Sequence, residues 1–348
     1  MIRVLIAEDS KTVATLLSAI IDNDPGIEVV GHATNGQQAV EMTYKLKPDL
    51  ITMDIRMPIM DGFEATRMIM STQPTPIIVV SSSVNNEELR ITFRAIEEGA
   101  LSVIEKPRGL SHAEADDIRQ ELLETIYAMA DVKVIKRSRT IKKPDANNFK
   151  KLLNIKQRSY DILAIAGSTG APAVLQEIIS SLPANFPIPV VIVQHISKGF
   201  IVGLSSWLQG NTLLNVKMAE ANEILQPGTV YFAPDDNHLT VSKVNNDLIA
   251  ELSHSKKVNG FMPSGDVLFD SVSEACGRKA IGIVLTGMGK DGAKGLKNMH
   301  DAGAHTIVQD SESAVVYGMP GKALALEAVD KVVNVDTMAA YLSGILQG

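Results

Sequence analysis

Short apolar runs alternate with amphipathic segments along most of this chain, and this alternation restricts the possible fold more than any other feature. The pattern covers roughly the first 128 residues and resumes with different content from Tyr160. Apolar runs that end abruptly at polar residues are typical of buried strands, and the segments between them have helical spacing. A repeat of this kind gives parallel strands with helices on both faces of the sheet. The sequence therefore predicts an α/β protein with two mainly parallel, doubly wound sheets.

The expected elements can be placed by residue range. In the first part we expect strands at 2–7, 28–31, 50–53, 77–80 and 102–105, and helices at 12–21, 37–46 and 118–129. In the second part we expect strands at 162–166, 188–195, 230–233, 239–242, 248–252, 280–285 and 306–308. Helices are expected there at 172–179, 263–275, 293–299, 322–328 and 338–346.

Charge divides the chain into three parts. Residues 1–128 carry a net charge of −9, residues 129–158 of +8, and residues 159–348 of −6. Residues 129–158 also lose the periodic pattern, so we expect a basic linker between two acidic domains, 1–128 and 159–348. A nucleic-acid-binding protein usually carries its positive charge on a folded surface. Two acidic domains without a helix-turn-helix pattern therefore argue against a nucleic-acid partner.

Two features bear on the cellular compartment. Cys276 is the only cysteine, so no disulfide can form within the chain, as is usual in a reducing cytoplasm. The amino-terminal residues lead directly into an expected strand, and no apolar run approaches the roughly 18 residues that cross a bilayer. We therefore expect a cytoplasmic protein without membrane insertion.

Polar residues stand where the strands of the first sheet are expected to end. They are Glu8, Asp9, Asp54, Ser81 and Lys106. Ligands of parallel sheets bind at the carboxyl ends of the strands. Three carboxylates at one edge repel each other and favour a hard cation such as Mg²⁺, which could bridge to a phosphate. The lysine and the serine hydroxyl could then bind an acyl phosphate formed on one carboxylate.

The apolar run 162–166 ends at the turn Gly167-Ser-Thr-Gly170, and a helical pattern follows. A serine at such a corner can be a nucleophile at the positive end of a helix, although the turn could equally bind phosphate or only cap the helix. His195 ends one expected buried strand and Asp291 lies just beyond another, so the three side chains could converge. A histidine activates a serine hydroxyl, and a carboxylate orients that histidine. The order Ser, His, Asp differs from that of α/β-hydrolases.

Other polar residues have simpler interpretations. We expect His238 to lie in a surface turn, and His254, His300 and His305 to be surface residues. Asp266 stands near a helix start, where a capping or dipole role accounts for it, and Cys276 is expected to be a core residue.

The first 125 residues resemble the receiver domain of two-component response regulators. The motifs are Glu8-Asp9-Ser10, Met53-Asp54-Ile-Arg-Met-Pro-Ile-Met-Asp-Gly62, Val80-Ser81-Ser82 and Glu105-Lys106-Pro107. The resemblance implies a flavodoxin-like fold and phosphorylation of Asp54 by a histidine kinase. It also implies Mg²⁺ held by Glu8, Asp9, Asp54 and the backbone carbonyl of Arg56, with Ser81 and Lys106 binding the phosphate. Receivers often carry an aromatic residue where this chain has Val103.

Residues 160–345 resemble the chemotaxis methylesterase family, commonly called CheB, in which a receiver precedes this domain. The motifs are Gly167-Ser-Thr-Gly170, Val193-Gln-His195, Pro263-Ser-Gly-Asp-Val-Leu-Phe269, Thr286-Gly-Met-Gly-Lys-Asp-Gly292 and Val316-Tyr-Gly-Met-Pro320. The resemblance implies a Rossmann-like domain with a triad of Ser168, His195 and Asp291. Thr169 would assist at the nucleophile, and the backbone N–H of Met288 would help to form the oxyanion hole.

The implied reaction is hydrolysis of glutamyl methyl esters on chemoreceptors, with release of methanol, together with deamidation of receptor glutamines. No cofactor is implied for the ester chemistry. The alternative is a non-enzymatic response regulator whose output domain binds a protein partner. That alternative leaves the placement of Ser168, His195 and Asp291 unexplained.

Overall fold

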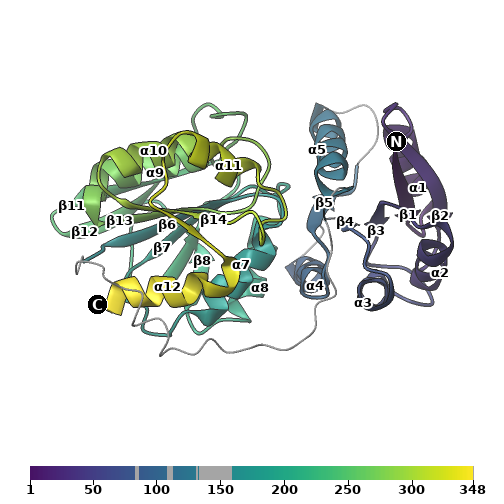
Figure 1. Cartoon of the computed structure of the whole chain (residues 1–348), viewed down its shortest axis with the longest axis horizontal. Helices are drawn as coiled ribbons and strands as arrows, with labels where there is room; N and C mark the ends of the chain where they lie inside the picture. Colours follow the sequence, from purple (N-terminus) through teal and green to yellow (C-terminus); the bar gives the residue numbers. More distant parts are fainter. Residues whose placement is uncertain (83–85, 108–112, 131, 133–158, 348) are drawn as a thin grey trace. The chain divides into compact units, whose positions relative to one another are not determined.

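The computed structural model describes residues 1–82, 86–107, 113–130, 132 and 159–347 (Figure 1). Most of the expected linker, 129–158, lies outside these residues. The chain forms two compact units, the first built around the elements from β1 to α5 and the second around most of those from β6 onward. Both are α/β units, so the predicted fold class is confirmed.

The first unit is a five-stranded parallel sheet in the order β2-β1-β3-β4-β5. Its strands are β1 (Ile2–Ala7), β2 (Ile27–Ala33), β3 (Leu50–Met53), β4 (Ile77–Ser81) and β5 (Ser102–Glu105). Its helices are α1 (Lys11–Ile21), α2 (Gly36–Leu46), α3 (Gly62–Thr72), α4 (Asn86–Glu97) and α5 (Ala113–Ala130). Helix α3 packs against both α2 and α4, so these three form one layer.

Side-chain caps explain where three helices of this unit begin. Asn35 Oδ1 accepts from Gln38 N at 2.9 Å, and Asp61 Oδ1 accepts from Glu64 N at 2.7 Å. Ser10 Oγ accepts from Val13 N at 3.5 Å, a longer contact. Such caps satisfy backbone N–H groups that the helix itself leaves without partners. Helices α1 and α2 each begin one residue before the predicted start, and α3 and α4 were not predicted.

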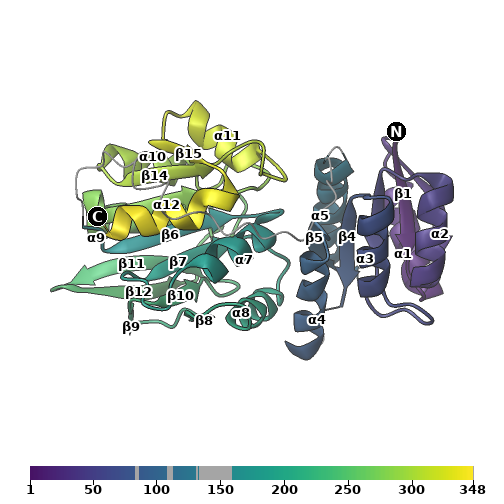
Figure 2. The ribbon, with the colours of Figure 1, turned by 60° about the horizontal axis from the view of Figure 1, so that its bottom comes forward.

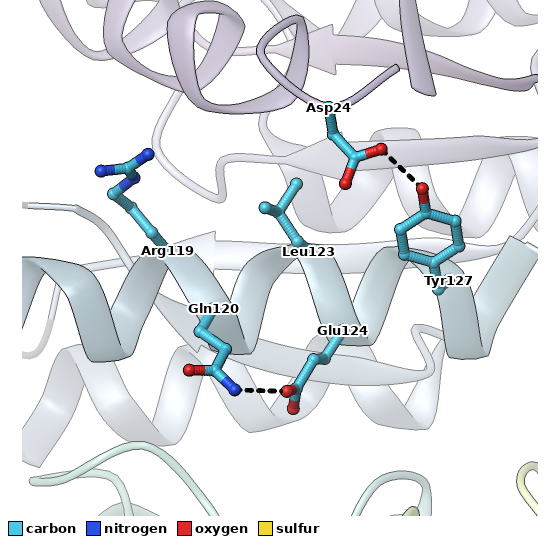
Figure 3. A pocket seen from close by; sticks show the side chains of 6 residues that line it. All are labelled: Asp24, Arg119, Gln120, Leu123, Glu124 and Tyr127. Carbon is cyan, nitrogen blue, oxygen red and sulfur yellow. Dashed lines mark hydrogen bonds between the residues drawn. The ribbon is translucent and has the colours of Figure 1, made fainter. Parts of the chain in front are cut away.

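Helix α5 is tied to the turn before β2. The Tyr127 hydroxyl donates to Asp24 Oδ1 at 2.6 Å, and both side chains lie at the edge of a hollow of about 420 Å³ (Figure 3). A Cβ at Gly26 would lie 2.2 Å from the Tyr127 oxygen, so any other residue there would displace the tyrosine side chain.

The second unit is a seven-stranded parallel sheet in the order β15-β14-β13-β6-β7-β10-β8 (Figures 1 and 2). Its strands are β6 (Ile162–Gly167), β7 (Val190–Gln194), β8 (Asn215–Met218), β10 (Thr229–Phe232), β13 (Ala280–Val284), β14 (His305–Gln309) and β15 (Lys331–Val333). A three-stranded antiparallel sheet adds β9 (Glu223–Ile224), β11 (His238–Val244) and β12 (Asp247–Ser253).

Helices cover both faces of the seven-stranded sheet (Figure 1). Helices α9 (Gly265–Cys276), α10 (Ala293–Asp301) and α11 (Gly318–Ala325) lie over one face. Helices α7 (Ala171–Ser181), α8 (Ile201–Gln209) and α12 (Val335–Gln347) lie over the other. A 3₁₀ turn at Gly277–Lys279 joins α9 to β13. No helix within the described residues is long and apolar enough to span a bilayer.

The differences from prediction in this unit lie mainly at its edges. Strands β8, β9 and β15 and helix α8 were not predicted, and α11 begins at Gly318, four residues before the expected 322. Strands β8 and β15 end the sheet on either side and bury few side chains, so their hydrophobic pattern is weak. Pro320 occupies the first turn of α11, where its missing N–H costs no helical hydrogen bond.

Candidate functional site

Three adjacent strands of the second sheet, β13, β6 and β7, end close to one another. Gly167 at the end of β6 pairs with Gln194 at the end of β7, so Ser168 and His195 follow at neighbouring positions. On the other side of β6, Val284 pairs with Ala166, and the loop after β13 carries Asp291. The structure therefore places all three predicted residues at the carboxyl edge of neighbouring strands.

Ser168 occupies the corner between β6 and α7. Its N–H donates to Thr286 O at 3.1 Å, and its carbonyl accepts from Ala171 N at 3.0 Å. Gly170 has a φ of 80°, a left-handed conformation that strains other residues, and α7 follows at once with Pro172 in its first turn. The serine side chain thus lies at the amino-terminal end of a helix, where negative charge is stabilised.

Gln194 connects the backbone of Ser168 to that of His195, a role that sequence reasoning did not identify. Its Nε2 donates to Ser168 O and to His195 O, each at 2.8 Å. The side chain is 3% exposed. The buried amide group of Gln194 therefore fixes the backbone of Ser168 relative to that of His195.

His195 faces Asp291 through one ring nitrogen. Nε2 lies 3.0 Å from Asp291 Oδ2, although the direction of approach departs from that of a linear hydrogen bond. The other ring nitrogen, Nδ1, is buried and has no hydrogen-bond partner among the described residues. The histidine is therefore anchored at Nε2, and Nδ1 remains open for proton transfer.

Asp291 accepts hydrogen bonds at both carboxylate oxygens. Oδ2 accepts from Gly265 N at 2.6 Å, and Oδ1 accepts from Ser264 Oγ at 2.7 Å and Asn259 Nδ2 at 3.1 Å. Burial alone would raise the pKa of Asp291, but the contact with His195 and these hydrogen bonds lower it to about 2. The carboxylate is therefore ionised at neutral pH although it is 1% exposed.

A second acid lies directly behind Asp291. Asn259 Nδ2 donates to Asp266 Oδ2 at 2.7 Å as well as to Asp291, and Asp266 Oδ1 accepts from Gly295 N at 2.8 Å. Burial raises the pKa of Asp266; the N–H of Gly295 offsets part of this, and the charge of Asp291 adds to it. Asp266 does stand in the first turn of α9, as expected, but its side chain bonds to α10 and to Asn259.

Thr169 and Met288, the other predicted catalytic residues, lie in loops beside Ser168. The Thr286 hydroxyl donates to Thr169 O at 3.1 Å, which fixes the turn after the serine. A Cβ at Gly287 would lie 2.6 Å from Ser168 Cβ, so the loop before Met288 passes directly against the serine. The Gly287 N–H is occupied by Val316 O at 3.0 Å, so this group does not point into the site.

The expectation for His238 is wrong. His238 is fully buried rather than in a surface turn; Nδ1 accepts from Ser264 N at 3.2 Å, and Nε2 lies 3.1 Å from Lys256 O. The side chains of His300 and His305 are 34% and 16% exposed, so His300 lies at the surface as expected and His305 is largely covered; each lies 3.4 Å from an oxygen of Asp330. Cys276 is half-buried, and burial raises the pKa of its thiol to about 11, as suits a packing role.

The first unit gathers its predicted polar residues at the ends of β1, β3, β4 and β5. Ligand oxygens of Glu8, Asp9 and Asp54 lie within 4.8 Å of one another. Lys106 Nζ lies 2.9 Å from both Glu8 Oε2 and Asp54 Oδ2, and the Ser81 hydroxyl lies 3.2 Å from that of Thr92. The hollow that these residues line, together with Arg56, measures about 210 Å³.

Negative charge exceeds positive charge among the residues that line this hollow. Burial raises the pKa of both Glu8 and Asp54, in spite of the neighbouring ammonium group of Lys106. Burial opposes the charge of Lys106 itself, but its contacts with the two carboxylates raise its pKa overall. Three carboxylates face one lysine, and all of the candidate ligands are oxygens. This donor set fits Mg²⁺.

Comparison with protein families identifies both units. The family model for CheB methylesterase matches residues 163–342, and that for the response regulator receiver domain matches residues 4–115.

Individual relatives match over nearly the full chain. A protein-glutamate methylesterase/protein-glutamine glutaminase of Myxococcus xanthus is 43% identical, over 100% of this chain and 98% of the relative. Another, of Syntrophus aciditrophicus, is 44% identical, over 98% and 97%. The crystal structure of the Thermotoga maritima CheB methylesterase catalytic domain is 38% identical with a TM-score of 0.53, and covers 54% of this chain and 100% of that structure.

Proposed function

The chain belongs to the CheB methylesterase family, and from that premise we propose that it hydrolyses glutamyl methyl esters on chemoreceptors and releases methanol. The same site would deamidate receptor glutamines, with ammonia as the leaving group. The observation that supports the proposal is the position of Ser168, His195 and Asp291 after three adjacent strands, with His195 Nε2 3.0 Å from the ionised Asp291.

The reaction begins at the serine. Ser168 Oγ attacks the ester carbonyl while His195 takes its proton, at Nδ1 because Nε2 faces Asp291. The electron pair of the carbonyl moves onto its oxygen, which backbone N–H groups near Thr169 and Met288 stabilise. Loss of one such donor typically costs about 2.7–4 kcal/mol of barrier.

The second half releases the products. The C–O bond to the methoxy group breaks, and His195 returns the proton so that methanol leaves. Water then attacks the glutamyl enzyme with His195 as base, which frees Ser168 and leaves a receptor carboxylate. Asp291 stabilises the imidazolium in both halves without taking a proton, because its pKa of about 2 keeps it ionised.

The first domain would control this reaction. A histidine kinase of a chemosensory pathway would phosphorylate Asp54, and Ser81 and Lys106 would bind the phosphoryl group. Glu8, Asp9, Asp54 and the Arg56 backbone carbonyl would hold Mg²⁺, which neutralises charge during phosphoryl transfer. Phosphorylation would shift an equilibrium towards a form in which Ser168 is accessible, and tenfold activation needs only about 1.4 kcal/mol. We expect the protein to act in the cytoplasm.

The proposed function is tested by methanol release from a methylated chemoreceptor. The purified full-length protein should release methanol, and mass spectrometry should show free glutamates at the former ester positions. A regulator that only binds a protein partner would release none. Absence of methanol from every candidate receptor, with and without a phosphodonor, would favour that alternative.

Replacing Asp54 with asparagine should abolish the stimulation of methanol release by a small-molecule phosphodonor. The ratio of the rates of methanol release with and without the phosphodonor should then be about one. The same change should raise the melting temperature of the first domain in the presence of EDTA, because burial raises the pKa of Asp54. Its ionised form therefore opposes folding, and this cost increases as the pH rises through the folded-state pKa. Added Mg²⁺ should stabilise the parent protein more than the variant.

The matched control is Glu41→Gln, which removes one charge from an exposed position on α2. It should keep both the stimulation and the Mg²⁺ response of the parent. Stimulation that persisted in Asp54→Asn would exclude this residue as the phosphorylation site.

A further inference from the structure

The imidazole of His195 is covered on one face by the ring of Phe261. The ring centroids lie 3.9 Å apart and the planes are 3° from parallel. Pairs of neutral aromatic rings prefer offset or edge-to-face arrangements with centroids 4.5–7 Å apart. A cation, by contrast, is attracted directly over the negative face of a ring. The observed geometry therefore suits a charged imidazole better than a neutral one.

A tight turn holds Phe261 in this position. Val258 N donates to Phe261 O at 3.0 Å, and Phe261 N donates to Val258 O at 2.9 Å. Asn259 and Gly260 between them have φ values of 54° and 89°, as a two-residue Asn-Gly turn requires. The ring is therefore presented by a closed backbone unit rather than by an open loop.

The same segment also fixes the carboxylate partner of His195. Asn259 Nδ2 and Ser264 Oγ both donate to Asp291 Oδ1. Ser264 is in turn anchored through its N–H to the buried His238. This segment, 258–264, thus makes two kinds of contact. Phe261 covers the face of the His195 ring, and Asn259 and Ser264 bind Asp291 Oδ1, whereas His195 faces Asp291 Oδ2.

We propose that Phe261 is a positioning residue for the hydrolysis. Its ring keeps the imidazole in the plane in which Nε2 meets Asp291, and it stabilises the imidazolium that forms when the proton leaves Ser168 Oγ. The inference rests on the proposed function, because a histidine that never takes a proton gains nothing from such a contact. The ring would act on the transition state more than on substrate binding, so it should affect kcat and leave KM unchanged.

A competing explanation is that Phe261 only fills space beside His195. Fluorination separates the two, because it weakens the negative face of the ring while nearly preserving its shape. Incorporation of monofluoro-, difluoro- and trifluorophenylalanine at position 261 should lower kcat stepwise, by about five- to tenfold in total, with KM unchanged. A side chain that only fills space would give a flat series.

Conventional variants complete the test. Phe261→Tyr keeps the ring and should retain kcat within about twofold, whereas Phe261→Leu keeps apolar volume without a ring and should lose about tenfold. Melting temperatures identify any variant that loses activity through unfolding. The control series places the same fluorinated residues at Phe186, which is buried in the second unit outside the 258–264 segment and should leave kcat unchanged.

The outcomes also separate this inference from the proposed function. A parent protein that releases no methanol contradicts the proposed function itself. An active parent with a flat fluorination series at position 261 overturns the role of Phe261 alone. A stepwise fall at position 261, together with a flat series at position 186, supports it.

Discussion

Replacing Ser168 with alanine should lower the rate of methanol release by about 10⁵-fold, because no other group can form the acyl enzyme. A residual rate above that of water is expected, since the backbone N–H groups of the site remain. The fold should be retained, because the hydrogen bonds of Ser168 to Thr286, Ala171 and Gln194 all involve backbone atoms of the serine. Methanol release under saturating receptor measures the loss.

The control is Ser180→Ala, which removes an exposed hydroxyl near the end of α7, the helix that begins beside Ser168. It should retain the parental rate, and both variants should keep the parental melting temperature within about 2 °C. A Ser168→Ala protein that released methanol at the parental rate would exclude the serine mechanism. The assignment to the CheB methylesterase family would still hold, but another residue would have to act as the nucleophile.

The placement of polar residues at strand ends was predictable because of the nature of parallel sheets. A buried strand must be apolar along its length, so the first polar residue after it marks the carboxyl edge. Glu8, Asp54, Ser168 and His195 all follow strands that the structure places at or within a residue or two of the expected bounds. Their convergence follows from the strand order, which brings β6 between β13 and β7.

The environment of Asp291 was not predictable in the same way. Asn259 and Ser264 precede it by about 30 residues and reach it through a turn whose position depends on the packing of α9 against α10. The Asn-Gly pair at 259–260 does predict a turn, but not what the turn contacts. His238 illustrates the same point: its sequence neighbours indicate a surface turn, and the distant segment 256–264 covers it.

Edge elements were missed for an energetic reason. Val216 is the only buried residue of β8, and Val333 the only buried residue of β15, so hydrogen bonding to one neighbouring strand defines these strands more than their hydrophobic pattern does. A pattern that reports burial cannot detect a strand that buries little. The central strands, which precede the site residues, bury every side chain, and all three were predicted.

Asp291→Asn should reduce kcat/KM by about 10³- to 10⁴-fold while the domain stays folded. In the parent protein, each oxygen of Asp291 faces only hydrogen-bond donors. An asparagine at this position must therefore turn its NH₂ group towards the donors of one of the two oxygens. The Gly265 N–H, at 2.6 Å from Oδ2, cannot change its role. On the Oδ1 side the Ser264 hydroxyl can rotate to accept, and the other two donors, Asn259 Nδ2 at 3.1 Å and the Asp266 N–H at 3.4 Å, are farther away. The amide oxygen should therefore remain beside Gly265 and His195, which keeps the imidazole oriented but removes the charge that stabilises it. Asp247→Asn, at an exposed hairpin position, is the matched control and should be fully active.

The pH dependence of stability gives a second measurement on the same pair of variants. Because the folded-state pKa of Asp291 is lowered from 3.8 to about 2, its ionised form stabilises the domain above pH 4, and this stability is lost as the pH falls towards 2. For a side chain that is 1% exposed, the difference corresponds to about 2 kcal/mol of unfolding free energy. Denaturant titrations at pH 5 and pH 3 should show about half of this loss, ~1 kcal/mol, in the parent and in Asp247→Asn, and a smaller loss in Asp291→Asn. An equal loss of stability in all three proteins would mean that Asp291 is not held in its ionised form by His195, Ser264 and Asn259. A parental kcat/KM in Asp291→Asn would exclude Asp291 from the mechanism.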